Sequence, residues 1–429
     1  MKSHWNIINF ENADISIIDG DRGKNYPSQG ELYKNEFCLF LSAKNVSIDG
    51  FQFVDCQFIT KEKDAILRNG KLERNDIVLT TRGTVGNVGF YDNNINYNNV
   101  RINSGMVIFR FKNPEYLSEF YYHFFRSKLF TEQVASRVSG SAQPQLPIKD
   151  LKCIEIPLPP IPEQKAIAEV LSALDDKIKH NLLMNNTLEE MVMALYKHWF
   201  VDFGPFKNGK FFESEIGMIP EGWKVYKLEE VCERIFSGGT PSTEARDYWN
   251  GDIPWLSSGE TRNKYIIETD KYITKLGLER SSAKYAKKGD IVIASAGQGK
   301  TRGQTSYLLI DTTVNQSVLC FRAKAGLITS HILFMNLSMR YDEFRHISDS
   351  FSTRGSLTKD LIGSQIRISL PSFPIESEFQ VKLEGIFEQI ENLIRENCVL
   401  IKTRDYLLPK LISGEIRVKD AEIMAKELV

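Results

Sequence analysis

Residues 294–301 have the sequence ASAGQGKT, the stretch of this chain that most resembles a catalytic motif. It matches a relaxed phosphate-loop pattern, with Ala294 where the first glycine usually stands. A phosphate loop must lead into a helix whose N-terminal amides bind the phosphates, whereas the following residues, RGQTSYLLIDTT, favour a strand. The corresponding loop in the first half, residues 80–87, has no lysine. We therefore expect no nucleotide site at this loop.

Other catalytic signatures are missing from the sequence. It contains no acidic-proline-proline-aromatic methyltransferase motif, no glycine-rich adenosyl-binding loop and no G-x-S-x-G elbow. The histidines show no metal-ligand spacing, and the cysteines form no C-x-x-C pair: His4, His123, His180, His198, His331 and His346; Cys38, Cys56, Cys153, Cys232, Cys320 and Cys398. We expect a binding protein without a catalytic residue, a metal site or a cofactor of its own.

Polar, basic and glycine-rich loops stand at corresponding places in the two halves. One pair is TTRGTVGN (80–87) with ASAGQGKTRGQ (294–304), and the other is SRVSGSAQPQ (136–145) with SFSTRGS (350–356). Arg, Lys, Asn and Gln can bind base edges or phosphates, and glycine lets the backbone approach closely, although any one of these residues could sit in an ordinary polar turn. The candidate DNA contacts are Arg82, Thr84, Asn87, Arg137, Ser141, Gln143, Gln298, Lys300, Arg302, Gln304 and Arg354.

Charge is distributed unevenly along the chain. The formal net charge is −1, but the segments 1–156, 157–215, 216–371 and 372–429 carry +1, −3, +4 and −3. Either this is scatter or it has a period of half the chain. The N-terminus lacks the apolar core of a signal peptide, no 18-residue apolar run occurs, and scattered cysteines suit a reducing compartment. We expect a cytoplasmic protein.

Short sequence matches between the two halves of the chain indicate an internal repeat. LFLSAKN (39–45) matches PWLSSGE (254–260), and NDIVLTTRGTVG (75–86) matches GDIVIASAGQGK (289–300). PIKDL and IPLP in the first half likewise correspond to LTKDL and ISLP in the second, in the same order and at nearly the same offset. Ordered matches at nearly one offset favour an internal duplication.

Each half ends in a proline-containing stretch followed by a heptad pattern. Apolar residues recur at alternating steps of four and three, which favours a long helix with a coiled-coil seam over an ordinary core helix. Pro162 suits the first helical turn, and Pro409 should end or kink the second helix near Leu408. The predicted helix-pair interface is Ile167, Leu171, Leu174, Ile178, Asn181, Leu188, Val192, Leu195, Leu383, Ile386, Ile390, Leu393, Asn397, Leu400 and Leu407.

The predicted fold class is mixed α/β, with two globular domains separated by two long antiparallel coiled-coil helices. Helices of roughly 33–40 residues would span about 50–60 Å at 1.5 Å per residue, and so would hold the domains apart. Strands are expected at RNDIVLTTRG, NSGMVIFRF, GDIVIASAG and NQSVLCFRA, and amphipathic helices at 116–136 and 330–348. The predicted domains are 1–156 and 216–371, followed by helical segments at 157–215 and 372–429.

The sequence resembles the specificity (S, or HsdS) subunits of type I restriction–modification enzymes. The resemblance rests on IPLPPIPEQKAIAEVLSALDDKI and LEEMVMALYKHWFVDF in the centre, IPEGWKVYKLEEVCERIFSGGTPS at the start of the second half, and DYLLPKLISGEIRV near the end. It covers nearly the whole chain, and the order of the repeats matches as well. The N-terminal residues 1–28 match the usual opening less well than residues 219–243 do, so the register of the first domain is less secure.

The resemblance implies two target-recognition domains, each for one half of a bipartite, asymmetric DNA sequence across a non-specific spacer. It also implies docking of two adenine-N6 methyltransferase (M) subunits on the helices and recruitment of restriction/translocase (R) subunits. S-adenosylmethionine, ATP and Mg would then be bound by those partners, and this chain would bind none. The alternatives are a coiled-coil scaffold without DNA recognition, an autonomous nucleotide-dependent protein using Lys300, and an S-like chain fused to a catalytic function.

The heptad pattern also predicts a register. Antiparallel pairing of the two seams about their centres places Ile167 opposite Leu411 and Asn181 opposite Asn397. A buried asparagine pair commonly fixes register at a cost in stability, because a shifted register leaves an amide unpaired. The alternative is that both asparagines face solvent or a partner subunit.

We predict that the double variant Asn181→Leu, Asn397→Leu is at least as stable as the natural protein towards urea but pairs its helices in a looser register. If the helix pair sets the spacing of the half-sites, the variant should methylate targets with a wider range of spacer lengths. An unchanged spacer preference, determined by sequencing methylated DNA, would show that the asparagines do not set the register.

Overall fold

The computed structural model describes residues 5–140, 143–297, 299–351 and 356–428. It forms two compact units, Met1–His180 with Glu396–Val429 (unit 1), and Asn181–Arg395 (unit 2). The unit boundaries fall inside the two long helices, α5 (Ile161–Tyr196) and α11 (Phe373–Ile412), rather than at the ends of the predicted domains. Each unit therefore combines one globular part with a portion of both helices.

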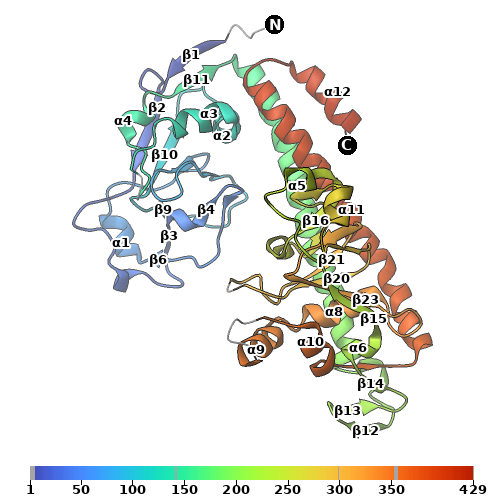
Figure 1. The fold of residues 1–429 in the computed structure, drawn as a ribbon. Helices are drawn as coiled ribbons and strands as arrows, with labels where there is room; N and C mark the ends of the chain where they lie inside the picture. Colours follow the sequence, from blue (N-terminus) through green and yellow to red (C-terminus); the bar gives the residue numbers. More distant parts are fainter. Residues whose placement is uncertain (1–4, 141–142, 298, 352–355, 429) are drawn as a thin grey trace. The chain divides into compact units, whose positions relative to one another are not determined.

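Unit 1 contains two principal sheets (Figure 1). An antiparallel sheet has the order β2-β10-β7-β8, and a second sheet has the order β6-β3-β9, in which β3 and β9 are parallel. Besides its portions of α5 and α11, the unit has the strands β1 (Asn6–Asn9), β2 (Ile15–Asp19), β3 (Cys38–Leu41), β4 (Val46–Ser47), β5 (Gly50–Phe51), β6 (Phe58–Ile59), β7 (Ile77–Thr80), β8 (Val88–Phe90), β9 (Val100–Ile102), β10 (Met106–Phe111) and β11 (Glu155–Leu158). Its shorter helices are α1 (Lys61–Ile66), α2 (Ser118–Arg126), α3 (Lys128–Ala135), α4 (Ile148–Leu151) and α12 (Val418–Leu428).

Unit 2 repeats this plan. One sheet has the order β15-β23-β20-β21-β17 and the other β18-β16-β22-β19, with β16 parallel to β22. Its elements are β12 (Phe211–Ser214), β13 (Gly217–Pro220), β14 (Lys224–Lys227), β15 (Cys232–Ser237), β16 (Trp249–Leu256), β17 (Tyr265–Ile266), β18 (Lys271–Ile273), β19 (Lys284–Ala286), β20 (Ile291–Ala294), β21 (Thr305–Leu308), β22 (Thr312–Val314), β23 (Val318–Ala323), β24 (Arg367–Leu370), α6 (Leu228–Val231), α7 (Lys275–Glu279), α8 (Ser330–Ser338), α9 (Tyr341–Phe351) and α10 (Lys359–Gln365).

The pairing of strands confirms the duplication. The order β2-β10-β7-β8 corresponds to β15-β23-β20-β21, and the parallel pair β3–β9 corresponds to β16–β22. Within those pairs Leu41 lies opposite Ile102, and Leu256 lies opposite Val314, as the sequence match of Leu41 with Leu256 requires. The four predicted strand regions form β7, β10, β20 and β23. All four residues of β7 and of β20 are buried, which accounts for their continuous apolar runs.

Strand pairing also settles the register of the N-terminal segment. Strand β1 pairs antiparallel with β11, which directly precedes α5, just as β14 pairs with β24, which precedes α11. Trp5 and Trp223 each directly precede the first of these strands, so the two tryptophans are equivalent. Trp223 is buried, and the Trp5 indole donates to Glu163 at 3.0 Å. The weakly matching opening thus has the same fold as its counterpart.

Each of the two predicted amphipathic helices is in fact two helices. The first breaks at Ser127, whose backbone is extended (φ −77°, ψ 156°) and whose hydroxyl donates to the Phe124 carbonyl at 2.6 Å. The second breaks between α8 and α9, where the Arg340 side chain donates to the Arg367 carbonyl at 2.8 Å. Hydrophobic periodicity continues across both breaks because both helices of each pair contribute residues to the same hydrophobic cluster.

The long helices begin where the proline signals predicted, but one ending differs. Helix α5 has Pro162 at its second residue and continues after Tyr196 as a π-helical turn, Lys197–Val201. Helix α11 does not end near Leu408, because it passes through Pro409 and ends at Ile412. A proline this close to a C-terminus removes only one helical hydrogen bond, and the Pro409 carbonyl still accepts from the Ser413 amide at 3.0 Å.

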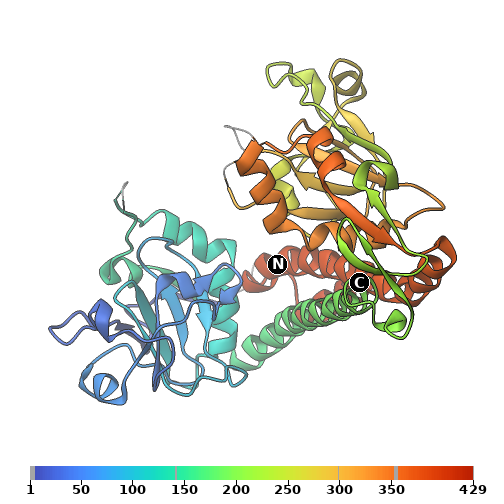
Figure 2. The same cartoon turned by 90° about the horizontal axis from the view of Figure 1, so that it is seen from below.

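Within each unit the two long helices run side by side and antiparallel (Figures 1 and 2). In unit 1, Arg404 donates to Asp175 at 2.9 Å, and the Asn397 amide donates to the Ile178 carbonyl at 3.3 Å. In unit 2 the rings of Trp199 and Phe379 lie 5.1 Å apart. These contacts agree with the predicted register. Asn181 and Asn397 are both buried, but they belong to different units, so their mutual contact stays a prediction.

The predicted apolar row of α5 shifts near its C-terminal end. Leu195 is 37% exposed, whereas Val192, Tyr196 and Phe200 are buried. The step after Val192 is therefore four residues instead of three, and Tyr196 replaces Leu195 in the core of unit 2. A further step of four reaches Phe200 through the π-helical turn, in which the added residue rotates the apolar face.

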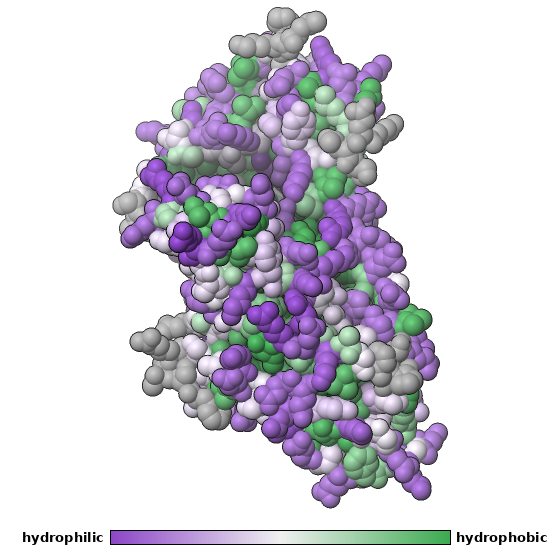
Figure 3. All heavy atoms as spheres, turned by 45° about the vertical axis from the view of Figure 1, so that its right-hand side comes forward, coloured by the Kyte–Doolittle hydropathy of each residue, from purple (hydrophilic) through white to green (hydrophobic). Residues whose placement is uncertain are grey.

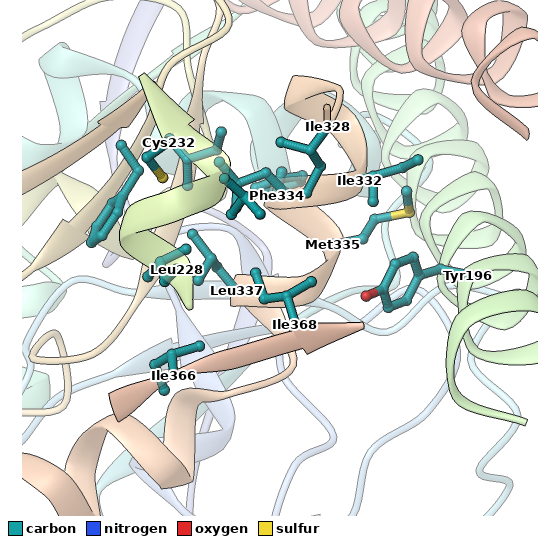
Figure 4. Packing of buried hydrophobic residues seen from close by; sticks show 14 of the residues in the cluster. Tyr196, Leu228, Cys232, Ile328, Ile332, Phe334, Met335, Leu337, Ile366 and Ile368 are labelled. Atoms are coloured by element: carbon teal, nitrogen blue, oxygen red, sulfur yellow. The ribbon is translucent and has the colours of Figure 1, made fainter. Parts of the chain in front are cut away.

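The core of unit 2 surrounds α8 (Figure 4). Ile332 and Met335 on this helix lie close to Tyr196 of α5, and Ile368 lies beside Leu337. On the molecular face shown in Figure 3, hydrophilic residues predominate and hydrophobic residues form small separate groups. None of the helices in the described ranges has an apolar stretch long enough to span a bilayer.

Candidate nucleic-acid interface

In unit 1 the two predicted loops meet at the end of the antiparallel sheet where β7 ends. The loop between β7 and β8 is closed by the Gly86 amide, which donates to the Thr80 carbonyl at 3.0 Å, and by the Thr80 amide, which donates to Asn87 at 2.9 Å. The second loop joins it because the Leu146 amide donates to the Thr81 carbonyl at 2.9 Å. Two segments more than 50 residues apart in sequence thus form one surface.

Unit 2 builds the same junction. The Gly303 amide donates to the Ala294 carbonyl at 2.9 Å, and the Ala294 amide donates to Gln304 at 3.2 Å. The second segment joins through the Leu357 amide, which donates to the Ser295 carbonyl at 2.8 Å. Gly86 and Gly303 both have positive φ, 101° and 87°, so each hairpin requires glycine at this position. In unit 1 the two predicted loops are therefore brought together. In unit 2 the first predicted loop is bonded to Leu357, which directly follows the second loop, and residues 352–355 of that loop lie outside the described residues.

The predicted site residues differ in how available their side chains are. Thr84, Gln143 and Lys300 are exposed, and Arg82 is half-buried beside Gln145. Arg82, Thr84 and Gln143 thus lie on the loop surface of unit 1, and Lys300 lies on the first loop of unit 2. Ser141, Gln298 and Arg354 lie outside the described residues.

Other candidates serve the protein itself. The Asn87 side chain donates to the Val46 carbonyl at 2.8 Å, and Arg137 donates to the carbonyls of Gln133 at 2.9 Å and Cys153 at 3.2 Å. Gln304 is half-buried. The bonds of Asn87 and Arg137 hold the loops in shape, and the sequence offered no signal that would separate these two residues from exposed ones.

Arg302 is a correction to the predicted site. Its side chain is 6% exposed, and its guanidinium bonds to Asp349 of α9 at 2.5 Å. A guanidinium buried against a carboxylate cannot reach DNA without breaking this pair. The sequence could not show this, because Asp349 is 47 residues away and is brought near only by the packing of α9.

The resemblance of ASAGQGKT to a phosphate loop ends at the backbone. Strand β20 ends at Ala294, and the next regular element is strand β21, starting at Thr305. The strand that the sequence predicted after this loop is thus present, and the described residues of the loop lead into no helix whose N-terminus could bind a phosphate. Among the described residues, no group of three or more His, Cys, Asp or Glu side chains is arranged to hold a metal ion.

Comparison with known proteins places the chain in a family. Residues 3–190 and 220–399 match the family model described as the type I restriction modification DNA specificity domain. The two matches together span most of the chain and correspond to its two repeats. The chain belongs to this family. The expectation of a DNA specificity subunit is thereby confirmed.

Individual relatives agree with this assignment. This chain is 30% identical over 354 residues to the type I restriction enzyme MjaIX specificity subunit of Methanocaldococcus jannaschii. The alignment covers 80% of this chain and 78% of the relative. The chain is 24% identical over 348 residues to the HindI specificity subunit of Haemophilus influenzae, covering 67% and 74%. The crystal structure of the S subunit from M. genitalium has the same fold, with a TM-score of 0.62 at 15% identity and coverage of 95% and 96%.

The same ion pair, with a buried aspartate, occurs in both units of the specificity subunit. In unit 1, Asp76 accepts from the Arg110 guanidinium at 2.9 and 2.7 Å and from the Glu73 amide at 2.7 Å. In unit 2, Asp290 accepts from Arg322, also at 2.9 and 2.7 Å. Each carboxylate directly precedes the strand that leads into a recognition loop. The sequence match of Asp76 with Asp290 indicated equivalence but not the arginine partners.

A second cluster, which sequence reasoning missed, fixes the recognition part of unit 1 to the helices. Asp175 of α5 binds Arg126 of α2 and Arg404 of α11. Burial alone would raise the pKa of the Asp175 carboxyl, but the two guanidinium groups lower it below its ordinary value. Arg404 occupies a position at which the heptad pattern otherwise has apolar residues. This exception was the feature of the sequence that could have indicated the cluster.

His123 completes this cluster. It is 2% exposed, and its Nε2 lies 3.0 Å from the Ser172 hydroxyl. Burial lowers the pKa of His123 to about 3, and the neighbouring arginines act in the same direction, against the attraction of Asp175. The imidazole is therefore neutral at pH 7, and its contact with Ser172 adds to the Arg126–Asp175 pair that joins α2 to α5.

We predict that unit 1 loses stability in acid because of His123. Between pH 6.5, the ordinary histidine pKa, and pH 3, the unfolded chain binds a proton that the folded chain excludes, so stability falls as the pH is lowered. His123→Gln should remove about 2 kcal/mol of the loss between pH 7.5 and 5. Urea unfolding of the intact chain at both pH values measures this, with the exposed His180→Gln as the matched control. Equal pH dependence in natural protein and His123→Gln would contradict the assignment.

Proposed function

We propose that the two units of this specificity subunit bind separate halves of one bipartite DNA sequence. The observation that carries the proposal is that the family match, the two-sheet scaffold and the paired polar loops each occur twice. A protein that needed one DNA contact would need one such unit. Two units with equal scaffolds and different loop sequences suit an asymmetric target with a non-specific spacer.

The exposed loop residues have the chemistry for this role. Glutamine can bind a base edge through its amide, threonine through its hydroxyl, and lysine either a base or a phosphate. Gln143 and Thr84 present these groups in unit 1, and Lys300 does so in unit 2. Near-neutral total charge suits a protein whose grip on the phosphate backbone is shared with partner subunits.

The catalytic steps are proposed to belong to partner subunits. S-adenosylmethionine would be bound by methyltransferase subunits, and ATP and Mg by restriction/translocase subunits, because the sequence offers no constellation for either chemistry. Helix α5 exposes Leu182, Leu183 and Met184 at 49–54% and Met191 at 48%. A row of exposed large apolar residues on a helix is typical of a protein contact, and it supports docking of the methyltransferase subunits there.

Two other functions were considered from the sequence. Nucleotide binding at Lys300 is opposed by the strand that follows the loop. A coiled-coil scaffold without DNA recognition leaves the doubled polar loops without a use. The first would be supported by ATP binding that depends on Lys300, and the second by a complex that methylates DNA without sequence preference.

Exchange of one recognition part tests the proposal. The segment first defined as 216–371 begins inside the hairpin β12–β13, so the cleaner exchange is residues 221–371, which keeps that hairpin whole. With methyltransferase subunits present, the chimaera should methylate a motif with one new half-site and one unchanged. The chain without those subunits should transfer no labelled methyl group. Change in both half-sites, or methyl transfer by the chain alone, would contradict the proposal.

Lys300 provides a finer test. If it binds a phosphate, Lys300→Ala should weaken DNA binding for all sequences and reduce the slope of log K against log salt by about 0.9. Lys275→Ala is the matched control, because Lys275 is 87% exposed on α7 and outside the loops. Binding titrations of the assembled complex at several salt concentrations measure both. An unchanged slope in Lys300→Ala would remove this residue from the interface.

A further inference from the structure

A tight turn stands at the same place in both units, directly beside the recognition loops. It joins β9 to β10 in unit 1 and β22 to β23 in unit 2. In the first turn the Asn103 side chain accepts from the Gly105 amide at 2.9 Å, and in the second Asn315 accepts from the Ser317 amide at 2.9 Å. The residues of both turns fall within the sequences NSGMVIFRF and NQSVLCFRA, for which strands were predicted, whereas β10 and β23 begin only after the turns.

Each turn is bonded to the loop that follows β7 or β20. The Thr81 amide donates to the Gly105 carbonyl at 2.8 Å, and the Ser295 amide donates to the Ser317 carbonyl at 2.8 Å. The turns therefore lie at the same end of the sheet as the proposed DNA-binding loops.

A third segment reaches each turn from the end of β2 or β15. Gly20 and Gly238 lie so close that an added Cβ would stand 2.1 Å from the Asn103 carbonyl oxygen and 1.8 Å from the Val314 carbonyl oxygen, respectively. The Gly238 amide donates to the Asn315 carbonyl at 3.2 Å. Only glycine permits this approach, and it fixes the position of the residue two places further on in each chain segment.

The residues two places after these glycines, Arg22 and Thr240, contact the turn at equivalent positions. In unit 1, Arg22 donates to the Ser104 carbonyl at 3.3 Å. In unit 2, the Thr240 hydroxyl donates to the Gln316 side-chain oxygen at 2.5 Å. Arg22, Thr240 and Gln316 are exposed, and Ser104 is half-buried. The two units therefore share the backbone scaffold of this contact, but unit 1 makes it with the Arg22 side chain and a backbone carbonyl, whereas unit 2 makes it with two side chains.

We infer that the pairs Arg22–Ser104 and Thr240–Gln316 are specificity-determining contacts, one pair for each half-site. This rests on the proposed function. Two units that bind different half-sites need the same rigid backbone and different exposed side chains. The turns and loops at this end of the sheet combine both. The residues that the two units share here, the two glycines and the two asparagines, shape the backbone, whereas of the residues that differ Arg22, Thr240 and Gln316 are exposed.

The chemistry of the pairs favours base edges as their ligand. The Thr240 hydroxyl occupies Oε1 of Gln316 and so orients the amide with its NH₂ group as the remaining donor, which suits a purine N7 or a carbonyl acceptor in the major groove. Arg22 makes its bonds to Asp19 and Ser104 through Nη2, and its side chain stays 46% exposed. Arginine in this state can still donate to guanine.

Gln316→Ser, which places the unit 1 residue in the unit 2 turn, tests the inference. The variant is expressed with its methyltransferase subunits in cells that lack other methyladenine, and the methylated motif is determined by sequencing. Methylation of the natural motif should fall about 5- to 150-fold, with a changed or relaxed base at one or two positions of one half-site. The other half-site and the spacer length should not change. Thr240→Val should relax the same positions, since it frees the amide to rotate.

Gln365→Ser is the matched control, the same substitution at an exposed residue of α10, and it should leave the motif unchanged. A Gln316→Ser protein that methylates the natural motif as well as the natural protein does would overturn the inference. If the reciprocal Ser104→Gln and Gln316→Ser both abolish methylation at every sequence, the pairs are structural, which also overturns it. Absence of any bipartite motif with the natural chain would instead overturn the proposed function.

Discussion

Each recognition unit completes its hydrophobic core with a helix segment from a distant part of the chain, and the rest of the molecule depends on this constraint. In unit 1, Leu400, Leu407 and Leu411 of α11 are buried in the same cluster as residues of β7, β10 and α2. In unit 2, Val192 and Tyr196 of α5 join a cluster formed by later residues. Full burial of each such side chain contributes about 1.5–3 kcal/mol, so neither globular part is complete without the antiparallel helix pair.

The polar groups along the helices give this packing its direction. Apolar side chains alone would tolerate a shift of one heptad, because each leucine would meet another. Asp175 between Arg126 and Arg404, and Asn397 on the Ile178 carbonyl, allow no such shift without leaving buried polar groups unsatisfied. The polar exceptions in the heptad pattern therefore restrict the chain to one pairing.

Duplication explains how a chain can keep a scaffold and still vary its ligand. The buried pairs Asp76–Arg110 and Asp290–Arg322 have matching geometry in the two units, since either arginine or carboxylate left alone would be costly. Beyond these pairs the loops differ in length and in side chains, and their exposed residues bear little of the folding energy. Such separation lets the two units differ in the sequence they bind without a change in fold.

The duplication, the two long helices and the central strands follow from the sequence alone, because short repeated matches and hydrophobic periods of 3.5 residues are local properties. The polar loops were visible for the same reason. Tertiary structure alone decided which loop side chains are exposed and which bond to the protein itself, since the pairing of Arg302 with Asp349 and of Asn87 with the Val46 carbonyl depends on segments distant in sequence. The tertiary structure also established that Trp5 is equivalent to Trp223, and it revealed the turns at Ser104 and Gln316. Strand pairing and the close approach of a glycine backbone hardly affect composition or periodicity, so the sequence alone could not show them.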